Sequence, residues 1–575
     1  MASVDSPTES LRGKLQRVLS GMRSPLAEAW FSNLLYLAIG FASFWATVGL
    51  KVLNPTNIGW LERDDGAGHF LGWHFFRNSD WEFPLGQNAN YGLEFGSVVL
   101  NTDSIPPLAI ALKIFSEVLP MPFQYEGLWI LISFLGQAVV AGNIGRLLGL
   151  SSRQRMLFAG LLTISPALLW RIDLGHFTHT GQFLVLFGIL IYLSKSRRTL
   201  KARWGIFLFL VAAINPYILA MILPIWVADV LRRISSERGN VSQIIGEFAL
   251  VSLLIWLATY VVGYGLIDGP SSSSGFGYYK LNLLGPIDSN GWSRFFPDLP
   301  SNPGEHEGYV YFGLGWIALI ISATILVIAR ARTFVTLIRN HSWLLVAALG
   351  TTAFSVSNVI SLGTLTFEVP IPSALTDLFS TLRSSGRMFW PVMYLAMVAA
   401  AVVLRSAMRA RVTTTLLAVF VIVQLVDLQP GIQVVKSRTT AEASDQWDNR
   451  LDDDVWTFVA ENYTAVRTVR PQNRATYWRE IGLFAGSNNL STNLVSVGRI
   501  SDQLQEVTQE KSEVAIKNNL LDSSAAYVVP PESEELVRAN LDCSDHGLAR
   551  ADGILLVLPG AATQFPCDWG SSNFE

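Results

Sequence analysis

The chain has 575 residues, of which 50% are hydrophobic and 15% are charged, and its formal net charge is −3. Such an apolar share, spread along the whole chain, excludes an ordinary soluble protein with one core. The near-neutral charge argues against a nucleic-acid partner. Residues 1–32 begin polar and basic for too long to be a cleaved signal peptide, so we expect a retained cytoplasmic N-terminal segment.

Apolar runs of about 20 residues are typical of membrane-spanning helices, and shorter runs span with the help of tilt or polar flanks. Eleven such segments predict a mainly α polytopic transmembrane domain over residues 33–428. They lie near 33–53, 126–146, 156–170, 178–194, 204–214, 217–231, 243–265, 311–329, 342–361, 388–404 and 412–428.

The segment 204–231 is either one tilted helix or two short helices joined at Asn215-Pro216. Only the two-helix interpretation keeps every strongly basic connector on the side of the N-terminus, as the positive-inside rule requires. We therefore predict the hairpin. The external segments are then 54–125, 171–177, 266–310, 362–387 and the C-terminal 429–575.

The first external segment is too long and too aromatic for a simple connector, so we expect it to fold onto the membrane surface. Its proline-bounded stretch 105–120 predicts an interfacial helix, with an additional span as the alternative.

Asp64 and Asp65 directly follow the first span. A carboxylate beside an apolar surface loses hydration, which raises its pKa and makes it a proton acceptor near neutral pH; the alternative is a pair of solvated loop acids. His69, four residues after Asp65, either orients the acid or contacts a phosphate. Asp103 precedes a proline-started helix, so capping of that helix is its main interpretation and substrate contact the other.

Arg171, Asp173, His176 and His179 crowd one short external turn. The Asp-x-x-His-x-x-His spacing is a weak signal for a metal site. The same arginine and histidines also suit a lipid phosphate, and histidines bound to helix-end backbone groups are the structural alternative.

Segment 266–310 is rich in glycine and serine, which is typical of a loop that closes over a substrate and also of a linker. Tyr279 and Lys280 are candidates for sugar or phosphate contact, and Glu307 stands just above the next span. Arg383 and Arg387 break the positive-inside trend at the outer mouth of a span. We interpret them as ligands of a bound phosphate, with lipid headgroups or Asp377 as alternatives.

After residue 429 the chain becomes polar. The stretches "AVRTVRP", "TNLVSVGR", "AAYVVP" and "GILLVLPG" predict strands, and 502–522 and 532–541 predict helices. This alternation predicts a small extracytoplasmic α/β domain over 429–575, a substrate-docking or structural module. The two cysteines of the chain, Cys543 and Cys567, lie here and form either a disulfide or two free thiols.

Several motifs recur in the order of a known family: "GHFLGWHFFRNSDWEFPLG", "NYGLEFGS", "TDSIPPLAIALK", "FQYEGLW", "GFGYYKLNLL", "GEHEGYVYFGLG", "SN" at 357–358 and "RSSGRMFWPVMY". Over residues 30–430 the chain resembles a bacterial multi-pass membrane family of unknown function. That family in turn is similar to the GT-C superfamily of glycosyltransferases, which use polyprenyl-phosphate sugars. In that superfamily a catalytic aspartate follows the first span.

The resemblance implies that Asp65, or its neighbour Asp64, is the base of an inverting sugar transfer at the outer face of a bacterial inner membrane. It implies a polyprenyl-phosphate sugar donor, and an acceptor that is a cell-envelope glycan or glycolipid. Arg383, Arg387 and Arg171 or His176 would stabilise the leaving phosphate. A divalent metal stays an open possibility. The alternatives are a transporter or flippase of lipid-linked saccharide, and a non-enzymatic surface assembly protein.

Overall fold

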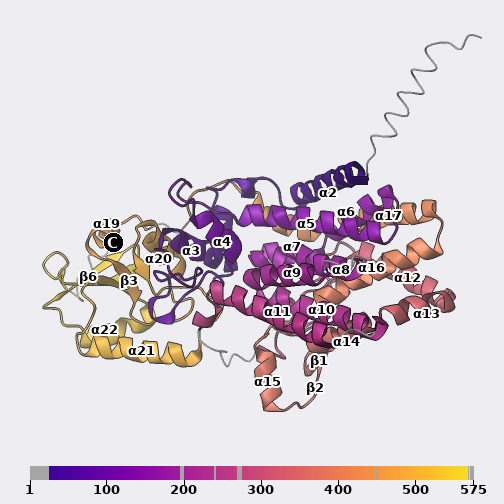
Figure 1. The fold of residues 1–575 in the computed structure, drawn as a ribbon. Coiled ribbons are helices and arrows are strands. Elements are labelled where there is room, and N and C mark those ends of the chain that lie inside the picture. The colour runs from indigo at the N-terminus through magenta and orange to yellow at the C-terminus, as the bar shows by residue number, and fades with distance from the viewer. Residues whose placement is uncertain are drawn as a thin grey trace, which may run out of the picture.

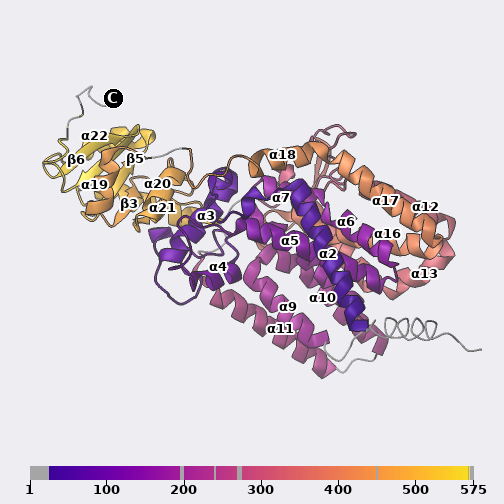
Figure 2. The same cartoon turned by 90° about the horizontal axis from the view of Figure 1, so that it is seen from above.

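The structure is a computed structural model that describes residues 25–194, 200–237, 241–267, 275–448, 451–567 and 569. This part of the chain is mainly helical. A long helical bundle and a small sheet domain lie end to end, with α3 (Asp64–Asn78) and α4 (Pro106–Lys113) between them (Figures 1 and 2).

The bundle contains most of the long helices. They are α2 (Pro25–Thr47), α5 (Glu126–Leu147), α6 (Ser152–Thr163), α7 (Pro166–Asp173), α8 (Phe183–Leu193), α9 (Leu200–Ile214), α10 (Pro216–Glu237), α11 (Val241–Val261), α12 (Leu314–Ala329), α13 (Ala331–Asn340), α14 (Ser342–Val356), α16 (Trp390–Ala407) and α17 (Ala410–Asp427). Their buried side chains form one continuous apolar core.

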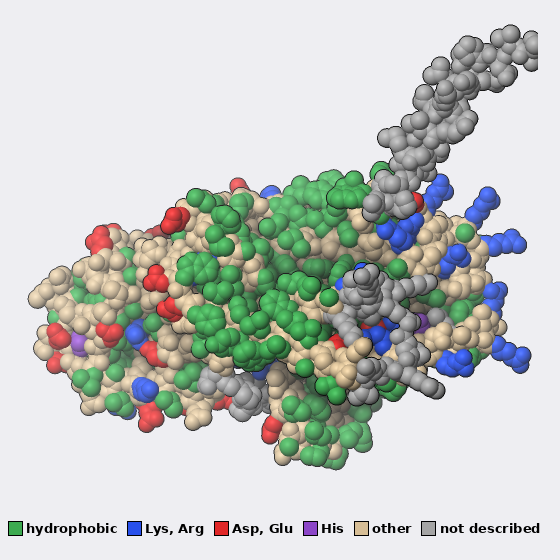
Figure 3. Space-filling model, in the orientation of Figure 1, with side chains coloured by type: hydrophobic (Ala, Val, Ile, Leu, Met, Phe, Trp, Pro, Cys, Tyr) green, Lys and Arg blue, Asp and Glu red, His purple; other side chains and the backbone are tan. Residues whose placement is uncertain are grey.

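Several of these helices are long and apolar enough to cross a membrane. Within the described residues they number six, or seven if the bent pair α12 and α13 is counted as one span. The predicted count of eleven is not reached. Segments 178–194, 204–214 and 342–361 correspond to apolar helices that are shorter than the six. Segment 217–231 lies in α10, which is not among the helices long and apolar enough to cross a membrane. Figure 3 shows hydrophobic side chains covering the visible face of the bundle, with Lys and Arg gathered at the end away from the sheet domain. These features are typical of a membrane protein.

The predicted hairpin at 204–231 is confirmed, since α9 ends at Ile214 and α10 begins at Pro216. Asn215 makes the break stable. Its side-chain oxygen accepts hydrogen bonds from the backbone N–H groups of Tyr217 and Ile218, which are two of the free donors at the start of α10.

The segment between α2 and α5 folds into short elements: η1 (Lys51–Leu53), η2 (Gly59–Leu61), α3 (Asp64–Asn78), η3 (Leu93–Phe95) and α4 (Pro106–Lys113). The predicted interfacial helix over 105–120 is therefore too long. The chain curls after Lys113 because the buried guanidinium of Arg77 collects the carbonyl oxygens of Ser116, Leu119 and Pro120. Those carbonyls face Arg77 instead of continuing the helical ladder.

Two further external segments return to the bundle. The first carries η5 (Tyr264–Leu266) and η6 (Glu305–Gly308). The second carries the hairpin β1 (Val359–Leu362) and β2 (Leu365–Glu368), then α15 (Ser373–Ser380) and η7 (Ser385–Phe389).

The C-terminal domain follows helix α18 (Gln429–Thr439). Its five-stranded mixed sheet has the order β4-β3-β5-β7-β6. The elements are α19 (Asp454–Asn462), β3 (Ala465–Thr468), α20 (Trp478–Ser487), β4 (Ser491–Thr492), α21 (Asp502–Lys517), β5 (Ala525–Val529), η8 (Pro531–Ser533), α22 (Glu534–Asn540), β6 (His546–Ala551) and β7 (Ile554–Pro559). A disulfide joins Cys543 and Cys567.

One predicted strand is mostly absent. "TNLVSVGR" contributes only Thr492 to β4, and the rest is irregular. The backbone groups of this stretch bond to the first external segment, as when Gly498 N–H donates to the carbonyl of Asn101 and Ser496 N–H donates to the hydroxyl of Tyr91. An apolar core shared by α3 and the sheet domain continues across this junction.

Candidate active site

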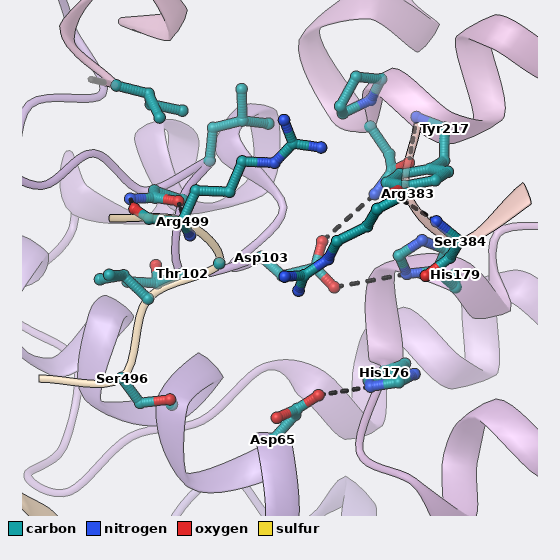
Figure 4. A pocket seen from close by; sticks show the side chains of 18 of the residues that line it. Asp65, Thr102, Asp103, His176, His179, Tyr217, Arg383, Ser384, Ser496 and Arg499 are labelled. Atoms are coloured by element: carbon teal, nitrogen blue, oxygen red, sulfur yellow. Dashed lines mark hydrogen bonds and ion pairs between the residues drawn. The ribbon is translucent and has the colours of Figure 1, made fainter. Parts of the chain in front are cut away.

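A pocket of about 650 Å³ lies where the helical bundle meets the C-terminal domain. The polar residues that line it come from the start of α3, the turn before α4, the turn after α7, the segment before α16, and the loops of the C-terminal domain. Figure 4 shows Asp65 pointing toward His176 and Asp103 toward His179, with Arg383 and Arg499 entering from opposite sides.

Gly175 brings His176 to Asp65. Its φ is +74°, and a Cβ at this position would lie 2.5 Å from the backbone nitrogen of Gly66. Only glycine therefore allows the turn after α7 to contact the first turn of α3. In this arrangement His176 Nε2 bonds to Asp65 Oδ2, and His176 Nδ1 lies 2.9 Å from Arg171 Nη1.

The second oxygen of Asp65 is bound by Arg474, which reaches in from the C-terminal domain. Burial alone would raise the pKa of Asp65. The interactions with His176 and the charge of Arg474 outweigh burial and hold this pKa well below its ordinary value. The predicted raised pKa is thus wrong, because the apolar surroundings are not the dominant influence on this carboxylate.

Asp103 forms a second carboxylate centre in the same pocket. Its Oδ2 lies 3.3 Å from His69 Nε2 and 3.6 Å from His179 Nδ1, and its Oδ1 accepts a hydrogen bond from Asn215 Nδ2. Burial would raise the pKa of Asp103, but the charge of His69 and the nearby imidazole of His179 hold it well below the ordinary value.

Two sequence interpretations change at this centre. Asp103 does not cap α4, whose N-cap residue is Ile105 with no side-chain cap bond. His69 contacts Asp103 and not Asp65, although it lies one turn after Asp65 on α3. Burial would lower the pKa of His69, but the nearby charge of Asp103 raises it.

Glu307 links the surroundings of Asp65 and Asp103 through the arginines Arg171 and Arg387. Its Oε2 lies 2.9 Å from Arg171 Nη1 and also pairs with Arg387 Nη2. Arg387 Nη1 in turn lies 3.0 Å from His179 Nε2. Gly386 permits this contact, since a Cβ there would lie 2.6 Å from the Cα of Gly308. Arg387 and Arg171 are thus bound to protein groups, and Arg387 also lines the pocket. Their contact with a phosphate stays a prediction.

Arg383 lines the pocket together with Tyr279, as predicted, and Arg499 lines it from the C-terminal domain. Arg499 donates to the carbonyl oxygen of Thr381. Among the residues that the structure describes, neither Arg383 nor Arg499 has a carboxylate partner. These two guanidiniums give the pocket its positive charge.

Three predicted site residues do not line this pocket: Arg171, described above, Asp64 and Lys280. Asp64 is exposed and pairs with Arg438 at 3.2 Å. Lys280 is buried, and its Nζ lies 3.0 Å from Glu305 Oε1. Both therefore stabilise loops beside the site.

The weak metal signal at 173–179 finds no support. Within the described ranges, no group of three or more His, Cys, Asp or Glu is arranged to hold a metal ion. Asp173 offers its backbone carbonyl to Arg438, and the imidazoles of His176 and His179 each lie between an arginine and an aspartate. We derive no step through a metal ion.

Sequence reasoning missed Arg474 and Arg499, and also Asn215 as a contact of Asp103. The two arginines lie more than 400 residues after Asp65 in a domain without a recognisable motif, so only the fold brings them to the pocket. For Asn215, the only sequence signal was its position at the Asn215-Pro216 break between two predicted helices.

Residues 37–429 match the family described as "Domain of unknown function (DUF6311)", and residues 455–559 match "DUF6311 C-terminal domain". A search of characterised protein sequences finds no match. Two solved structures of the oligosaccharyltransferase from Archaeoglobus fulgidus are similar. The archaeal oligosaccharyltransferase AglB in complex with an inhibitory peptide and a dolichol-phosphate has 11% identity and a TM-score of 0.39, over 91% of this chain and 73% of that chain. The apo form has 12% identity and a TM-score of 0.39, over 90% and 74%.

Proposed function

This chain belongs to the DUF6311 family, and we propose that it is a membrane glycosyltransferase of the GT-C type. It moves a sugar from a polyprenyl-phosphate donor to a cell-envelope glycan or glycolipid on the outer face of a bacterial inner membrane. The observation that carries the proposal is the pocket itself. In it, ionised carboxylates face arginines that have no carboxylate partner among the described residues, beside a bundle of apolar helices.

The charges of the pocket favour a phosphate-bearing donor. Glu307 pairs with both Arg171 and Arg387, whereas Arg383 and Arg499 line the pocket without a carboxylate partner among the described residues and can bind an anion from outside. Arginine binds phosphate oxygens through paired N–H groups. A polyprenyl chain in the surrounding lipid would bring its phosphate to the level of this pocket.

Asp65 is the better base of the two carboxylates. Both oxygens of Asp103 are engaged within the bundle, by His69, His179 and Asn215, whereas Asp65 Oδ1 is covered only by the half-exposed side chain of Arg474. An acceptor hydroxyl can replace that arginine at Oδ1.

In the transfer step the acceptor oxygen attacks the anomeric carbon, and the bond from that carbon to the phosphate oxygen breaks. The electron pair stays on the phosphate, where Arg383 and Arg499 stabilise it, and the hydroxyl proton passes to Asp65. The proton becomes strongly acidic as the new bond forms, so a carboxylate with a low pKa is a sufficient acceptor. A single displacement of this kind inverts the anomeric configuration.

In the proposed orientation the N-terminus lies in the cytoplasm and residues 429–575 lie outside. Lys and Arg at the end of the bundle away from the C-terminal domain support this orientation (Figure 3).

The test is the surface glycan of a strain that lacks this protein, complemented with the wild type or with Asp65→Asn. We expect the wild type to restore a missing sugar and Asp65→Asn to fail at equal expression. If Asp65→Asn restores the glycan, the catalytic role is wrong, and a transporter of lipid-linked saccharide becomes the better explanation.

A further inference from the structure

Two parallel chains of side chains run from Glu307 to the two pocket carboxylates. One passes through Arg171 and His176 to Asp65. The other passes through Arg387 and His179 to Asp103. The members between Glu307 and the aspartates are at most 9% exposed, so water does not compete for these contacts.

The arginines determine which imidazole nitrogen carries the proton. A guanidinium has only N–H donors, so the ring nitrogen that faces it must accept and cannot be protonated. Arg171 faces Nδ1 of His176, which leaves Nε2–H for Asp65. Arg387 faces Nε2 of His179, which leaves Nδ1–H for Asp103. The two histidines are therefore neutral and hold opposite tautomers.

We infer that Glu307 is a positioning residue: by fixing Arg171 and Arg387 it sets these opposite tautomers, so that each histidine presents one N–H to a pocket carboxylate. The inference rests on the proposed function for its use in catalysis, but the tautomers are a property of the protein alone. Because each carboxylate receives a neutral donor and not a proton, both stay ionised and ready for substrate.

The two chains are not equally tight. His176 is bonded directly to Asp65, whereas His179 Nδ1 lies 3.6 Å from Asp103, beyond a normal hydrogen bond. The buried Nδ1 of His179 has no hydrogen-bond partner among the described residues. This unused N–H donor is oriented toward the carboxylate of Asp103, which Asn215 and His69 hold in place. The distance between His179 and Asp103 can therefore shorten to that of a hydrogen bond.

The experiment is nitrogen-15 solid-state NMR of the full chain in lipid nanodiscs with labelled histidine. The chain has seven histidines, and His176→Asn and His179→Asn identify the two signals. We expect one neutral ring protonated at Nε2 for His176 and one neutral ring protonated at Nδ1 for His179. The same tautomer for both, or a doubly protonated ring at either position, overturns the inference.

Variants then test the role of Glu307. Glu307→Gln should give mixed tautomers at both histidines, while Glu305→Gln, which changes a neighbouring buried carboxylate paired with Lys280, should change neither. Unchanged spectra in Glu307→Gln contradict the inference. If Glu307→Gln does not fold, Arg171→Lys should disturb only His176 and Arg387→Lys only His179, and any other pattern contradicts it.

These outcomes separate the two proposals. The expected tautomers in a protein that transfers no sugar would leave the positioning role intact and remove the proposed function. Active protein with the wrong tautomers would do the reverse.

Discussion

The helical bundle and the C-terminal domain supply different kinds of side chain to the same pocket. The segments that connect the helices of the bundle supply Asp65, Asp103 and the histidines, most of them buried and bonded on more than one side. The C-terminal domain contributes Arg474, whose side chain is 52% exposed, and Arg499. Buried groups set up the chemistry, and more exposed cations complete the lining of the pocket.

This difference teaches that the C-terminal domain is part of the site and not only a docking module beside it. Without Arg474 and Arg499 the pocket would keep its carboxylates and Arg383, and would lose one of the two arginines that have no carboxylate partner among the described residues. Asp65 should therefore affect the chemical step, Arg383 and Arg499 should affect donor binding, and Arg474 should affect the pH dependence.

The largest effect is expected for Asp65→Asn, which removes the proton acceptor. Transfer should fall by about 10³-fold, measured as the rate of sugar transfer by purified protein at saturating donor. Asp64→Asn is the matched control, because Asp64 is exposed and bonds only to Arg438. Equal losses in the two variants would show that the acid is needed for the loop and not for the chemistry.

The next effect concerns the phosphate and compares one arginine from each region. Arg383→Ala and Arg499→Ala should each weaken binding of farnesyl phosphate by about tenfold, the loss of about 1.4 kcal/mol. Isothermal titration in nanodiscs measures it, with farnesol as the ligand without phosphate. Arg470→Ala, an exposed arginine of the C-terminal domain outside the pocket lining, should change nothing. If only Arg383→Ala weakens binding of farnesyl phosphate, the C-terminal domain is not part of the donor site.

How far the sequence predicts this site follows from where its residues lie in the chain. Asp65 and Arg383 stand at the ends of apolar runs, and hydropathy together with charge finds such positions. The pairing of His69 with Asp103 was not predictable, because a helical spacing of four suggests Asp65 and only the turn before α4 brings Asp103 nearer. Local sequence patterns identify candidate site residues, but long-range packing determines which residues they contact.

The same reasoning explains the errors in the fold. The helix expected over 105–120 stops at Lys113 because the carbonyls that follow are bound by Arg77, about 40 residues before them in the chain. The strand expected at 492–499 does not form, because backbone groups of this stretch bond to Asn101 and Tyr91 instead. Both errors involve backbone groups that bond across the boundary between segments, which periodicity cannot detect.

A smaller effect is expected for Arg474→Ser, and it concerns pH. Wild-type transfer requires ionised Asp65, and its lowered pKa puts the acid limb of the pH profile below the ordinary range of a carboxyl group. Removing the charge of Arg474 takes away one cause of that lowering, so the pKa rises and the limb moves to higher pH. The shift should be less than about one pH unit, because Arg474 is half-exposed and screened. A limb that moves down, or one unaffected by added salt, contradicts this role.

The smallest effect on transfer is expected at the far edge of the C-terminal domain. In the sheet order β4-β3-β5-β7-β6, β4 lies at the edge that bridges to Tyr91, while Cys543 and Cys567 flank the opposite pair β6 and β7. Replacing both cysteines by serine opens a loop of 24 residues, and the chain-entropy relation gives a loss of about 3 kcal/mol in the free energy of unfolding of this domain. Thermal unfolding followed by intrinsic fluorescence should register that loss, and transfer at 25 °C should stay unchanged because Arg474 and Arg499 lie at the other edge. If transfer falls together with stability, the two edges of the sheet are coupled, and the C-terminal domain acts on the pocket as one rigid unit instead of through two arginines.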